Sequence, residues 1–139
     1  MTQHVRDVMT AAPVAVGTLT GVGEVAQRMR DEDIGAVLVT ERDELRGLVT
    51  DRDLAVRVLA EGLDPARTTV REVCSPRLVT VSPDDESGRA LALMRRHALR
   101  RLPVVADGET VGMVALGDLA VEHDPESALG EISASAANT

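Results

Sequence analysis

An internal repeat constrains the fold of this chain more than any other feature. When the 139 residues are aligned with themselves at an offset of 65, the match runs without a gap from Val5/Val70 to Ala55/Ala120. Fifteen of the 51 aligned positions are identical, which is more than shared composition explains in a single register. We therefore expect two copies of one small structural unit.

Each copy is predicted to contain a strand, a helix, two strands and a second helix, in that order. In the first copy the strands are expected at 13–16, 36–40 and 45–50, and the closing helix at 51–61. In the second copy the strands are expected at 78–81, 102–106 and 110–115, and the closing helix from Gly117 to about His123. The helix after the first strand is indicated by apolar residues on one face: Val22, Val25, Ala26 and Met29, and then Ala90, Leu91 and Met94.

Two local patterns predict where elements begin and turn. Ser82, Pro83 and Asp85 fit the N-cap, the first helical position and the acidic residue of a capping box, so the helix of the second copy is expected to start there. Asp107-Gly108, between two β-rich runs, is typical of a tight hairpin.

The repeat also predicts the domain organisation. We assign a first unit to 5–62, a connection to 63–69, a second unit to 70–123 and a tail to 124–139. The tail is expected to fray, except for one helical turn that Leu129 and Ile132 can seat. A unit of about fifty residues cannot bury both faces of its sheet alone. We therefore expect a mixed α/β fold in which two β-α-β-β-α units pack around a pseudo-twofold axis.

The amino-acid composition excludes several kinds of function and location. Phe, Tyr and Trp are absent, so the core must be aliphatic. The net charge of −8 repels polyanions and makes nucleic acid an improbable partner. No window reaches the roughly 18 to 20 apolar residues of a membrane span. The N-terminus lacks the basic and apolar regions of a signal peptide, so we expect a cytoplasmic protein with no membrane partner.

The sequence contains little that indicates a catalytic site or a metal site. There is no nucleophile elbow, phosphate-binding loop or zinc-protease motif, so we expect no catalytic residues and no enzyme activity. His4, His97 and His123 lie far apart in sequence without metal-ligand spacing, so no metal site is expected. The single cysteine, Cys74, aligns with Met9, which favours a packing role over a reactive thiol.

One glycine pattern imitates a dinucleotide-binding motif. The segment 21–26 reads G-x-G-x-x-A at the start of a predicted helix, and Glu41 follows after the next strand. The preceding strand, however, is short and ends several residues before the first glycine. The repeat also aligns Glu86 with Gly21, so flexibility at the helix entry is the simpler interpretation.

A longer motif lies where the third strand of the first copy meets its closing helix. The segment 47–53, GLVTDRD, reads Gly-hydrophobic-hydrophobic-Thr-x-x-Asp. Together with the opening segment 8–14 and the segment 100–105 of the second copy, it resembles the cystathionine β-synthase (CBS) domain family over residues 5 to about 122. The resemblance implies a tandem CBS module whose two units pair, which often dimerises into a disc and binds adenosine-containing ligands between the units.

The implied site has a physical rationale. A helix that begins after Thr50 is expected to offer unpaired N–H groups and its positive dipole end to a phosphate, with the Thr50 hydroxyl adding a hydrogen bond. Asp53 can accept hydrogen bonds from ribose hydroxyls, and Arg52 can add positive charge. Without an aromatic ring, the base is expected to lie against aliphatic residues: Pro13, Val14, Ala36 and Val37.

The same motif has a purely structural interpretation, because Thr-x-x-Asp is also a helix N-cap with an acidic third residue. In the second copy Ala115 replaces Thr50 but Asp118 remains. A carboxylate without its capping hydroxyl favours ligand contact at Asp118, although an acidic residue near a helix N-terminus is favourable anyway.

The two sites are expected to differ at the phosphate end. Ala115 and Gly117 stand where the first site has Thr50 and Arg52. Arg101, next to Arg100, can bring charge to either cleft across the interface between the units, or the two arginines can form a solvated surface pair.

These observations predict a regulatory module that binds an adenine nucleotide (AMP, ADP or ATP) or S-adenosylmethionine in the cleft between its units. It would need no catalytic cofactor, would form a homodimer, and would signal by a change in packing or dimer geometry, with any effector on a separate protein. The alternative is a ligand-free protein-interaction or assembly module. RNA binding through the two neighbouring arginines is disfavoured by the net charge and the lack of aromatic platforms.

Overall fold

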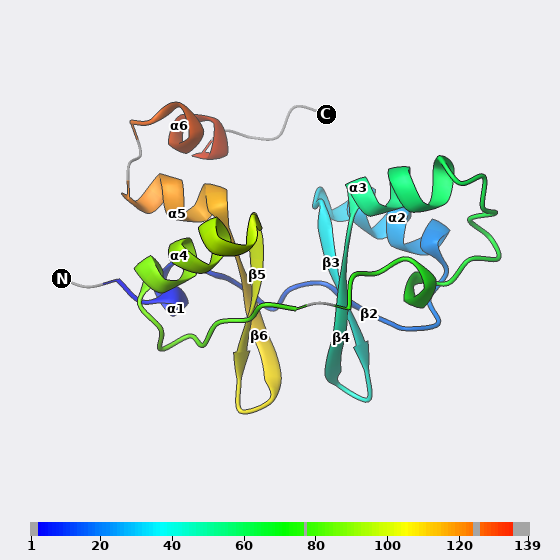
Figure 1. Ribbon diagram of the computed structural model, residues 1–139, viewed down its shortest axis with the longest axis horizontal. Coiled ribbons are helices and arrows are strands. Elements are labelled where there is room, and N and C mark those ends of the chain that lie inside the picture. The colour runs from blue at the N-terminus through cyan, green and yellow to red at the C-terminus, as the bar shows by residue number, and fades with distance from the viewer. Residues whose placement is uncertain (1–2, 77, 124–125, 135–139) are drawn as a thin grey trace. The chain divides into compact units, whose positions relative to one another are not determined.

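The computed structural model describes residues 3–76, 78–123 and 126–134, which form two compact units with strands and helices in each (Figure 1). One unit, called continuous here, is Pro13–Leu78. The other, called discontinuous, combines Met1–Ala12 with Val79–Thr139. The predicted mixed α/β architecture of two units is confirmed.

The continuous unit is built on a three-stranded sheet. Its elements are β2 (Ala15–Gly17), α2 (Val22–Glu32), β3 (Ala36–Glu41), β4 (Glu44–Thr50), α3 (Asp51–Leu54), the π-helical turn η1 (Ala55–Leu59) and the 3-10 turn η2 (Val70–Glu72). The strand order is β2-β3-β4, with β2 parallel and β4 antiparallel to β3. Ser75 forms an antiparallel bridge with Leu48 at the free edge of β4.

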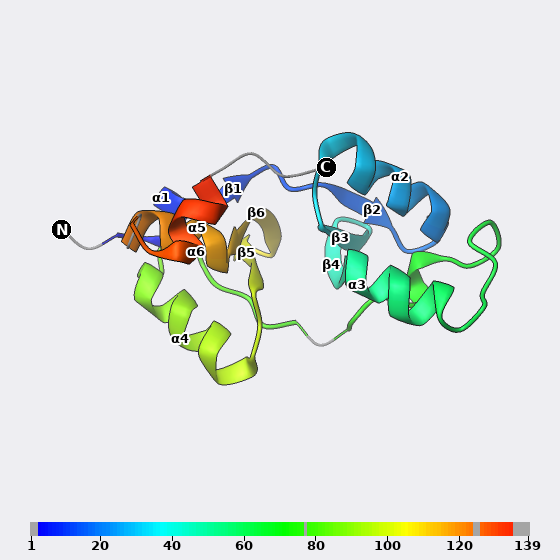
Figure 2. The same cartoon turned by 90° about the horizontal axis from the view of Figure 1, so that it is seen from above.

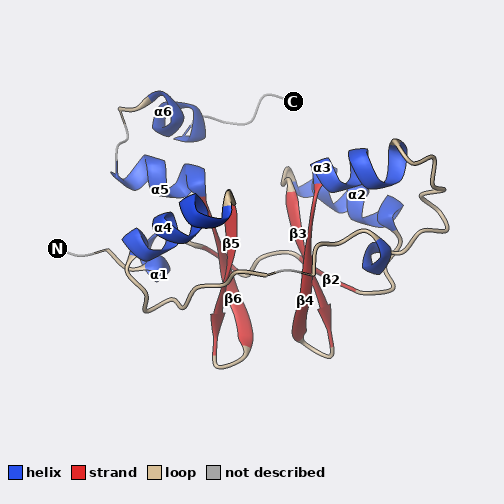
Figure 3. Ribbon diagram, in the orientation of Figure 1, coloured by secondary structure: helices blue, strands red, loops and turns tan. Residues whose placement is uncertain are grey.

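The discontinuous unit repeats this plan. Its elements are α1 (Val5–Val8), β1 (Thr10–Ala11), α4 (Ser87–His97), β5 (Arg101–Ala106), β6 (Glu109–Ala115), α5 (Leu116–His123) and α6 (Ala128–Ala134). The strand order is β1-β6-β5, all antiparallel. The strand expected at 78–81 is reduced to one parallel bridge between Val81 and Val104. In both units the hairpin turn lies at the end of the sheet away from the helices (Figure 3).

The opening segment of each sequence copy packs with the sheet of the other copy. Val5 and Val8 are buried in a core with the strands β5 and β6, whereas Val70 and Val73 are buried in a core with β3 and β4. The assignment of 5–62 and 70–123 describes the repeat, and for domain boundaries it stays a prediction. The two compact units divide the chain differently, into 13–78 and into 1–12 together with 79–139.

Strand spacing explains this exchange. In the continuous unit β2 lies on one edge of the sheet and Ser75 on the other, three strand spacings or about 14 Å apart. The four residue steps from Ala11 to Ala15 cover about 13 to 14 Å when fully extended. The opening segment would have to run straight across a packed sheet to reach the far edge of its own copy, so it joins the other sheet instead.

The predicted start of the helix in the second copy is wrong. Ser82 and Asp85 close a local turn, in which the Ser82 N–H donates to Asp85 Oδ2 at 2.9 Å, and α4 begins only after its N-cap, Glu86. The carbonyl oxygens of this turn are used by the opening segment, since Val5 N–H donates to the Asp85 oxygen at 2.8 Å. A contact with a distant segment therefore holds these residues outside the helix.

Other local predictions are confirmed. Asp107 and Gly108 both have positive φ angles (52° and 81°) in the β5–β6 turn, and Gly62, at φ 69°, follows the closing helix. On the predicted face of α2, Val22, Val25 and Met29 are buried, whereas Ala26 is exposed.

The predicted turn at Leu129 and Ile132 extends into the helix α6, which packs along α5 (Figures 1 and 2). The rest of the tail that was expected to fray, at 124–125 and 135–139, lies outside the described residues. Within the described part of the chain, no helix combines the length and the apolar character needed to cross a bilayer.

Candidate functional site

Most of the predicted ligand-binding residues lie at one end of the sheet in the continuous unit. Ala36 is paired with Thr50 across β3 and β4, and the Val14 carbonyl accepts a hydrogen bond from Leu38 N–H at 3.0 Å. Pro13 precedes Val14 on the same segment. The fold therefore gathers the first residues of β3, the last residue of β4 and the approach to β2.

Thr50 and Asp53 form a reciprocal capping box at this end. Asp53 N–H donates to Thr50 Oγ1 at 3.2 Å, and Thr50 N–H donates to Asp53 Oδ2 at 2.8 Å. The Asp53 side chain keeps only 19% of its exposure. The capping interpretation is thus realised, and it holds the carboxylate in one orientation.

The expectation that α3 offers unpaired N–H groups to a phosphate is wrong. Asp51 N–H donates to the Gly35 carbonyl oxygen at 3.0 Å, and Arg52 N–H donates to Asp51 Oδ1 at 2.9 Å. Asp53 N–H is bonded to Thr50, as described. The first three N–H groups of α3 therefore all have acceptors within the protein.

Arg57 belongs to the site although sequence reasoning missed it. Its Nε lies 3.8 Å from Asp53 Oδ1, and one Nη donates to the Val73 carbonyl oxygen at 3.1 Å. The second contact fixes the guanidinium beside the carboxylate. The spacing of four residues between an acidic and a basic side chain on a predicted helix was the available signal.

The remaining predicted residues of this unit differ in accessibility. The Arg52 side chain is exposed, and Pro13 and Val14 are half-buried. Ala36 is buried, with 9% of its surface exposed, and Val37 is completely buried in the core. A ligand at this end can therefore meet Pro13 and Val14 directly, whereas Val37 supports the sheet beneath them.

Asp118 and Arg101 lie together in the discontinuous unit. Arg101 is paired with Ala115 across β5 and β6, and Ala115 N–H donates to Asp118 Oδ2 at 3.0 Å. Asp118 therefore makes a capping contact through its own carboxylate, although Ala115 provides no hydroxyl. The carboxylate reaches back to the backbone N–H whether or not a hydroxyl stands at the cap.

Cys74 packs over a glycine of β4. A Cβ added at Gly47 would lie 2.7 Å from Cys74 Sγ, and the equivalent Gly112 is approached in the same way by Met9. Burial raises the pKa of the Cys74 thiol, and the negative charge of Asp53 acts in the same direction. Within residues 3–76, 78–123 and 126–134, no three His, Cys, Asp or Glu side chains are arranged to hold a metal ion.

Known proteins resemble the chain over nearly its whole length. The family model described as CBS domain matches twice, at residues 5–60 and 70–122. The CBS domain-containing protein YhcV of Bacillus subtilis is 40% identical over 126 residues, which cover 91% of this chain and 89% of YhcV. A crystal structure of Hypoxic Response Protein I with two coordinated zinc ions is similar with a TM-score of 0.79 and 35% identity, over 88% of this chain and 100% of that chain. The CBS domain pair of protein MJ0100, in complex with 5′-methylthioadenosine and S-adenosyl-L-methionine, shares the fold with a TM-score of 0.82 and 20% identity, over 91% of this chain and 100% of that chain.

Proposed function

Because this chain belongs to the CBS domain family, with one match in each repeat, we propose that it senses an adenosine-containing ligand at the Asp53 end of the continuous unit. A CBS domain pair is a regulatory module. The solved pair that binds 5′-methylthioadenosine and S-adenosyl-L-methionine supplies the ligand class. Occupancy would reach a separate effector protein, or act through self-association, and no step of this function requires catalysis.

The orientation of the Asp53 carboxylate is the observation that carries the proposal. Oδ2 is held by Thr50 N–H at 2.8 Å, and Oδ1 lies 3.8 Å from Arg57 Nε, which is beyond hydrogen-bond distance. Oδ1 therefore keeps acceptor capacity for the hydroxyl groups of a ribose. A carboxylate fixed before the ligand arrives loses little side-chain entropy on binding.

The adenosine moiety would provide most of the recognition. The half-buried Pro13 and Val14 offer an apolar surface to the base, with Ala36 beside them. Since the first N–H groups of α3 are already bonded, the 5′ substituent would meet side chains, with the exposed Arg52 closest in sequence. This arrangement accommodates AMP, ADP and ATP as well as S-adenosylmethionine.

Calorimetric titration with AMP and 2′-deoxy-AMP tests this site. The wild-type chain is expected to bind AMP about tenfold more tightly than 2′-deoxy-AMP, because a hydrogen bond to a carboxylate is lost. Asp53→Asn is expected to weaken AMP binding by a similar factor, and to bind the two ligands alike. Asn keeps an acceptor for Thr50 N–H, so the cap is preserved.

Asp43→Asn is the matched control for this titration. It makes the same change of charge in the same unit, at the exposed turn between β3 and β4, and is expected to bind AMP as the wild type does. Wild-type affinity in Asp53→Asn would refute the assignment of Asp53. A thermal-stability screen that includes S-adenosylmethionine and 5′-methylthioadenosine extends the test to the whole ligand class.

An exposed apolar face supports a homodimer, and also the alternative of a ligand-free assembly module. Val56, Leu59 and Leu63 retain 46%, 73% and 42% of their exposure along and just beyond η1. In the discontinuous unit the equivalent helix α5 is covered by α6. We propose that a second copy of the chain covers the face formed by Val56, Leu59 and Leu63.

Light scattering after size-exclusion chromatography tests the dimer. The wild-type chain is expected at twice the mass of 14.7 kDa, and Leu59→Glu at the monomer mass. Ile132→Glu is the control, because Ile132 is 71% exposed on α6. A wild-type monomer would refute the dimer, and a dimer without a response to any adenosine ligand would favour the assembly module.

A further inference from the structure

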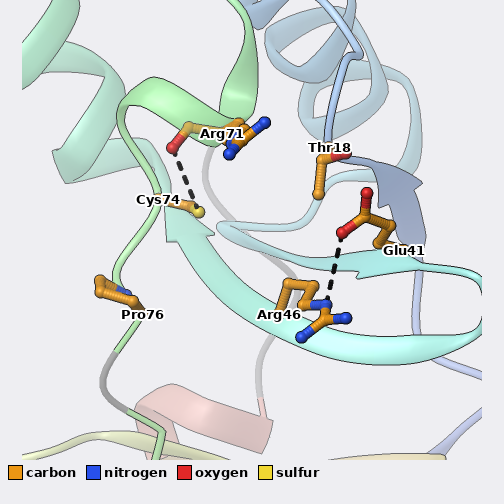
Figure 4. Close-up of a pocket in the computed structure, with 6 residues that line it drawn as sticks. All are labelled: Thr18, Glu41, Arg46, Arg71, Cys74 and Pro76. Atoms are coloured by element: carbon orange, nitrogen blue, oxygen red, sulfur yellow. Dashed lines mark hydrogen bonds and ion pairs between the residues drawn. The ribbon is translucent and has the colours of Figure 1, made fainter.

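A second polar pocket lies in the continuous unit and is not part of the Asp53 site. It is open, with a volume of about 450 Å³, and falls in the range of small-molecule sites (Figure 4). The residues that line it come from the turn after β2, from β3 and β4 near their shared hairpin, and from η2 and the segment that follows it: Thr18, Glu41, Arg46, Arg71, Cys74 and Pro76.

The register of the sheet separates the two sites. Ala36 is paired with Thr50 at one end of the β3–β4 hairpin, and Glu41 is paired with Glu44 at the other end. Five residue steps along β3 correspond to about 17 Å. A small ligand held by Thr18, Glu41 and Arg46 would therefore lie at the hairpin end, whereas the Cys74 wall of the pocket lies nearer to Asp53.

Backbone hydrogen bonds frame the pocket on two sides. Arg71 N–H donates to the Thr18 carbonyl oxygen at 3.1 Å, which fixes Arg71 beside the end of β2. Leu48 N–H donates to the Ser75 oxygen at 3.2 Å, and Ser75 N–H donates back at 3.0 Å, which fixes the Cys74 wall against β4. The site is thus held by the fold and does not depend on a free loop.

The two arginines of the pocket differ in their partners. Arg46 makes ion pairs with Glu41 at 3.5 Å and with Glu44 at 3.1 Å. Among the described residues, Arg71 has no carboxylate within ion-pair distance. Figure 4 shows Arg71 with Cys74 on one side of the pocket, facing Thr18, Glu41 and Arg46.

The repeat provides an internal comparison for Arg71. Its counterpart Arg6, 65 residues earlier, forms an ion pair with Asp84 at 2.9 Å. The residue equivalent to Asp84 in the continuous unit is Leu19, whose side chain is 74% exposed. The continuous unit thus keeps the arginine but lacks its acidic partner.

Of the other lining groups, Glu41 is a carboxylate whose charge is paired with Arg46 at 3.5 Å, and two others favour an anion. Thr18 carries a hydroxyl donor, and the half-buried Cys74 stays a neutral thiol because burial raises its pKa, so it does not repel negative charge. The repeat also restricts this lining to one unit, because Ala106 and Val111 stand at the positions of Glu41 and Arg46.

We propose that the pocket at the hairpin end of the continuous unit binds the phosphate or carboxylate group of a small molecule, with Arg71 as its principal partner and Arg46 and Thr18 as further donors. Guanidinium groups pair with both kinds of oxyanion through charge-assisted hydrogen bonds. The volume leaves room for an organic part beyond the oxyanion. The proposal does not rest on adenosine binding at Asp53.

Titration of the ¹⁵N-labelled chain with inorganic phosphate and with acetate, each against chloride at equal ionic strength, tests the site. Saturable shifts are expected at the amides of Thr18, Arg71 and Cys74. A response to phosphate alone identifies a phosphate site, a response to acetate alone a carboxylate site, and a response to both a general oxyanion site. The amides of Thr18 and Arg71, which lie together at the hairpin end, separate this binding from any phosphate held near Asp53.

Two variants are expected to weaken the binding by different routes. Arg71→Gln is expected to weaken it at least tenfold, and Leu19→Asp to weaken it several-fold by restoring the acidic partner seen for Arg6. Arg67→Gln, which is exposed in the same unit outside the pocket, and Ile132→Asp are the controls and should bind as the wild type does. Shifts equal to those in chloride, or wild-type affinity in Arg71→Gln, would overturn the proposal.

Discussion

At the scale of single residues, two glycines set how closely a crossing segment approaches each sheet. A Cβ at Gly47 would lie 2.7 Å from Cys74 Sγ and 3.0 Å from the Ser75 carbonyl oxygen. The sulfur can move, but the carbonyl cannot, because Ser75 is hydrogen-bonded to Leu48 in both directions. The glycine of the family motif is therefore required by this close approach.

Gly47→Ala is expected to lower the free energy of unfolding by about 2 kcal/mol, the range for overpacking in a closed site. Gly88→Ala is the matched control. Gly88 lies in α4 with no atom near the position of a Cβ, so alanine should raise stability by about 0.5 to 1 kcal/mol through helix propensity. Urea unfolding measures both, and equal effects in the two variants would contradict the close-approach argument.

The residues of the Asp53 site could be predicted only in part. Thr50 and Asp53 were found because a motif places them together in sequence. Arg57 was missed because its position depends on the Val73 carbonyl, which comes from the opening segment of the other copy. The role of Gly47 as a contact was likewise invisible, since Cys74 is distant in sequence.

At the scale of elements, the two closing helices begin differently. In both, the side chain of the acidic third helical residue, Asp53 or Asp118, accepts a hydrogen bond from the N–H of the last strand residue. Only Thr50 adds a side-chain acceptor for the third helical N–H, because Ala115 stands at the equivalent position. One helix start is thus capped from both directions and the other from one.

This difference predicts opposite effects of exchanging the two cap residues. Thr50→Ala should lower the free energy of unfolding by about 1 kcal/mol, and Ala115→Thr should raise it by about 0.5 to 1 kcal/mol. Thermal or urea unfolding monitored by circular dichroism provides the measurement. A loss of stability in Ala115→Thr would show that the start of α5 cannot accept a capping hydroxyl.

Elements were predictable where local sequence decides them. The hairpin at Asp107-Gly108 follows from its turn chemistry, and α2 from its apolar face. The start of α4 did not follow, because Ser82 and Asp85 close a turn as readily as they cap a helix. The choice between the two depends on backbone contacts with the segment at Val5, which no local pattern reveals.

At the scale of the whole molecule, the compact unit and the sequence repeat are different stretches of chain. Fragment 13–78 contains every buried residue of its core, including Val70 and Val73. Fragment 1–62 lacks both valines and the Ser75 bridge to β4. We expect fragment 13–78 to give a more dispersed amide spectrum than fragment 1–62, because only the first contains the whole core cluster.

Amide spectra and circular dichroism of the two fragments, recorded side by side, decide this prediction. Should fragment 1–62 fold as well as fragment 13–78, its own opening segment can reach the far edge of its sheet, and the strand-spacing argument fails. The sequence alone could not choose between these arrangements. An offset of 65 residues aligns Val5 with Val70 whichever sheet each of them joins.

The exchange of opening segments also fixes how a pulling force would pass through the molecule. Both chain ends enter the discontinuous unit, and the continuous unit is inserted between residues 12 and 79. Tension applied at the two ends would be carried by the contacts of α1 and β1 with β6, α4 and α5. The unit Pro13–Leu78 lies outside this path and would carry no force. The discontinuous unit would thus unfold first under tension. The continuous unit, which holds both proposed sites, would come under load only after the discontinuous unit has opened.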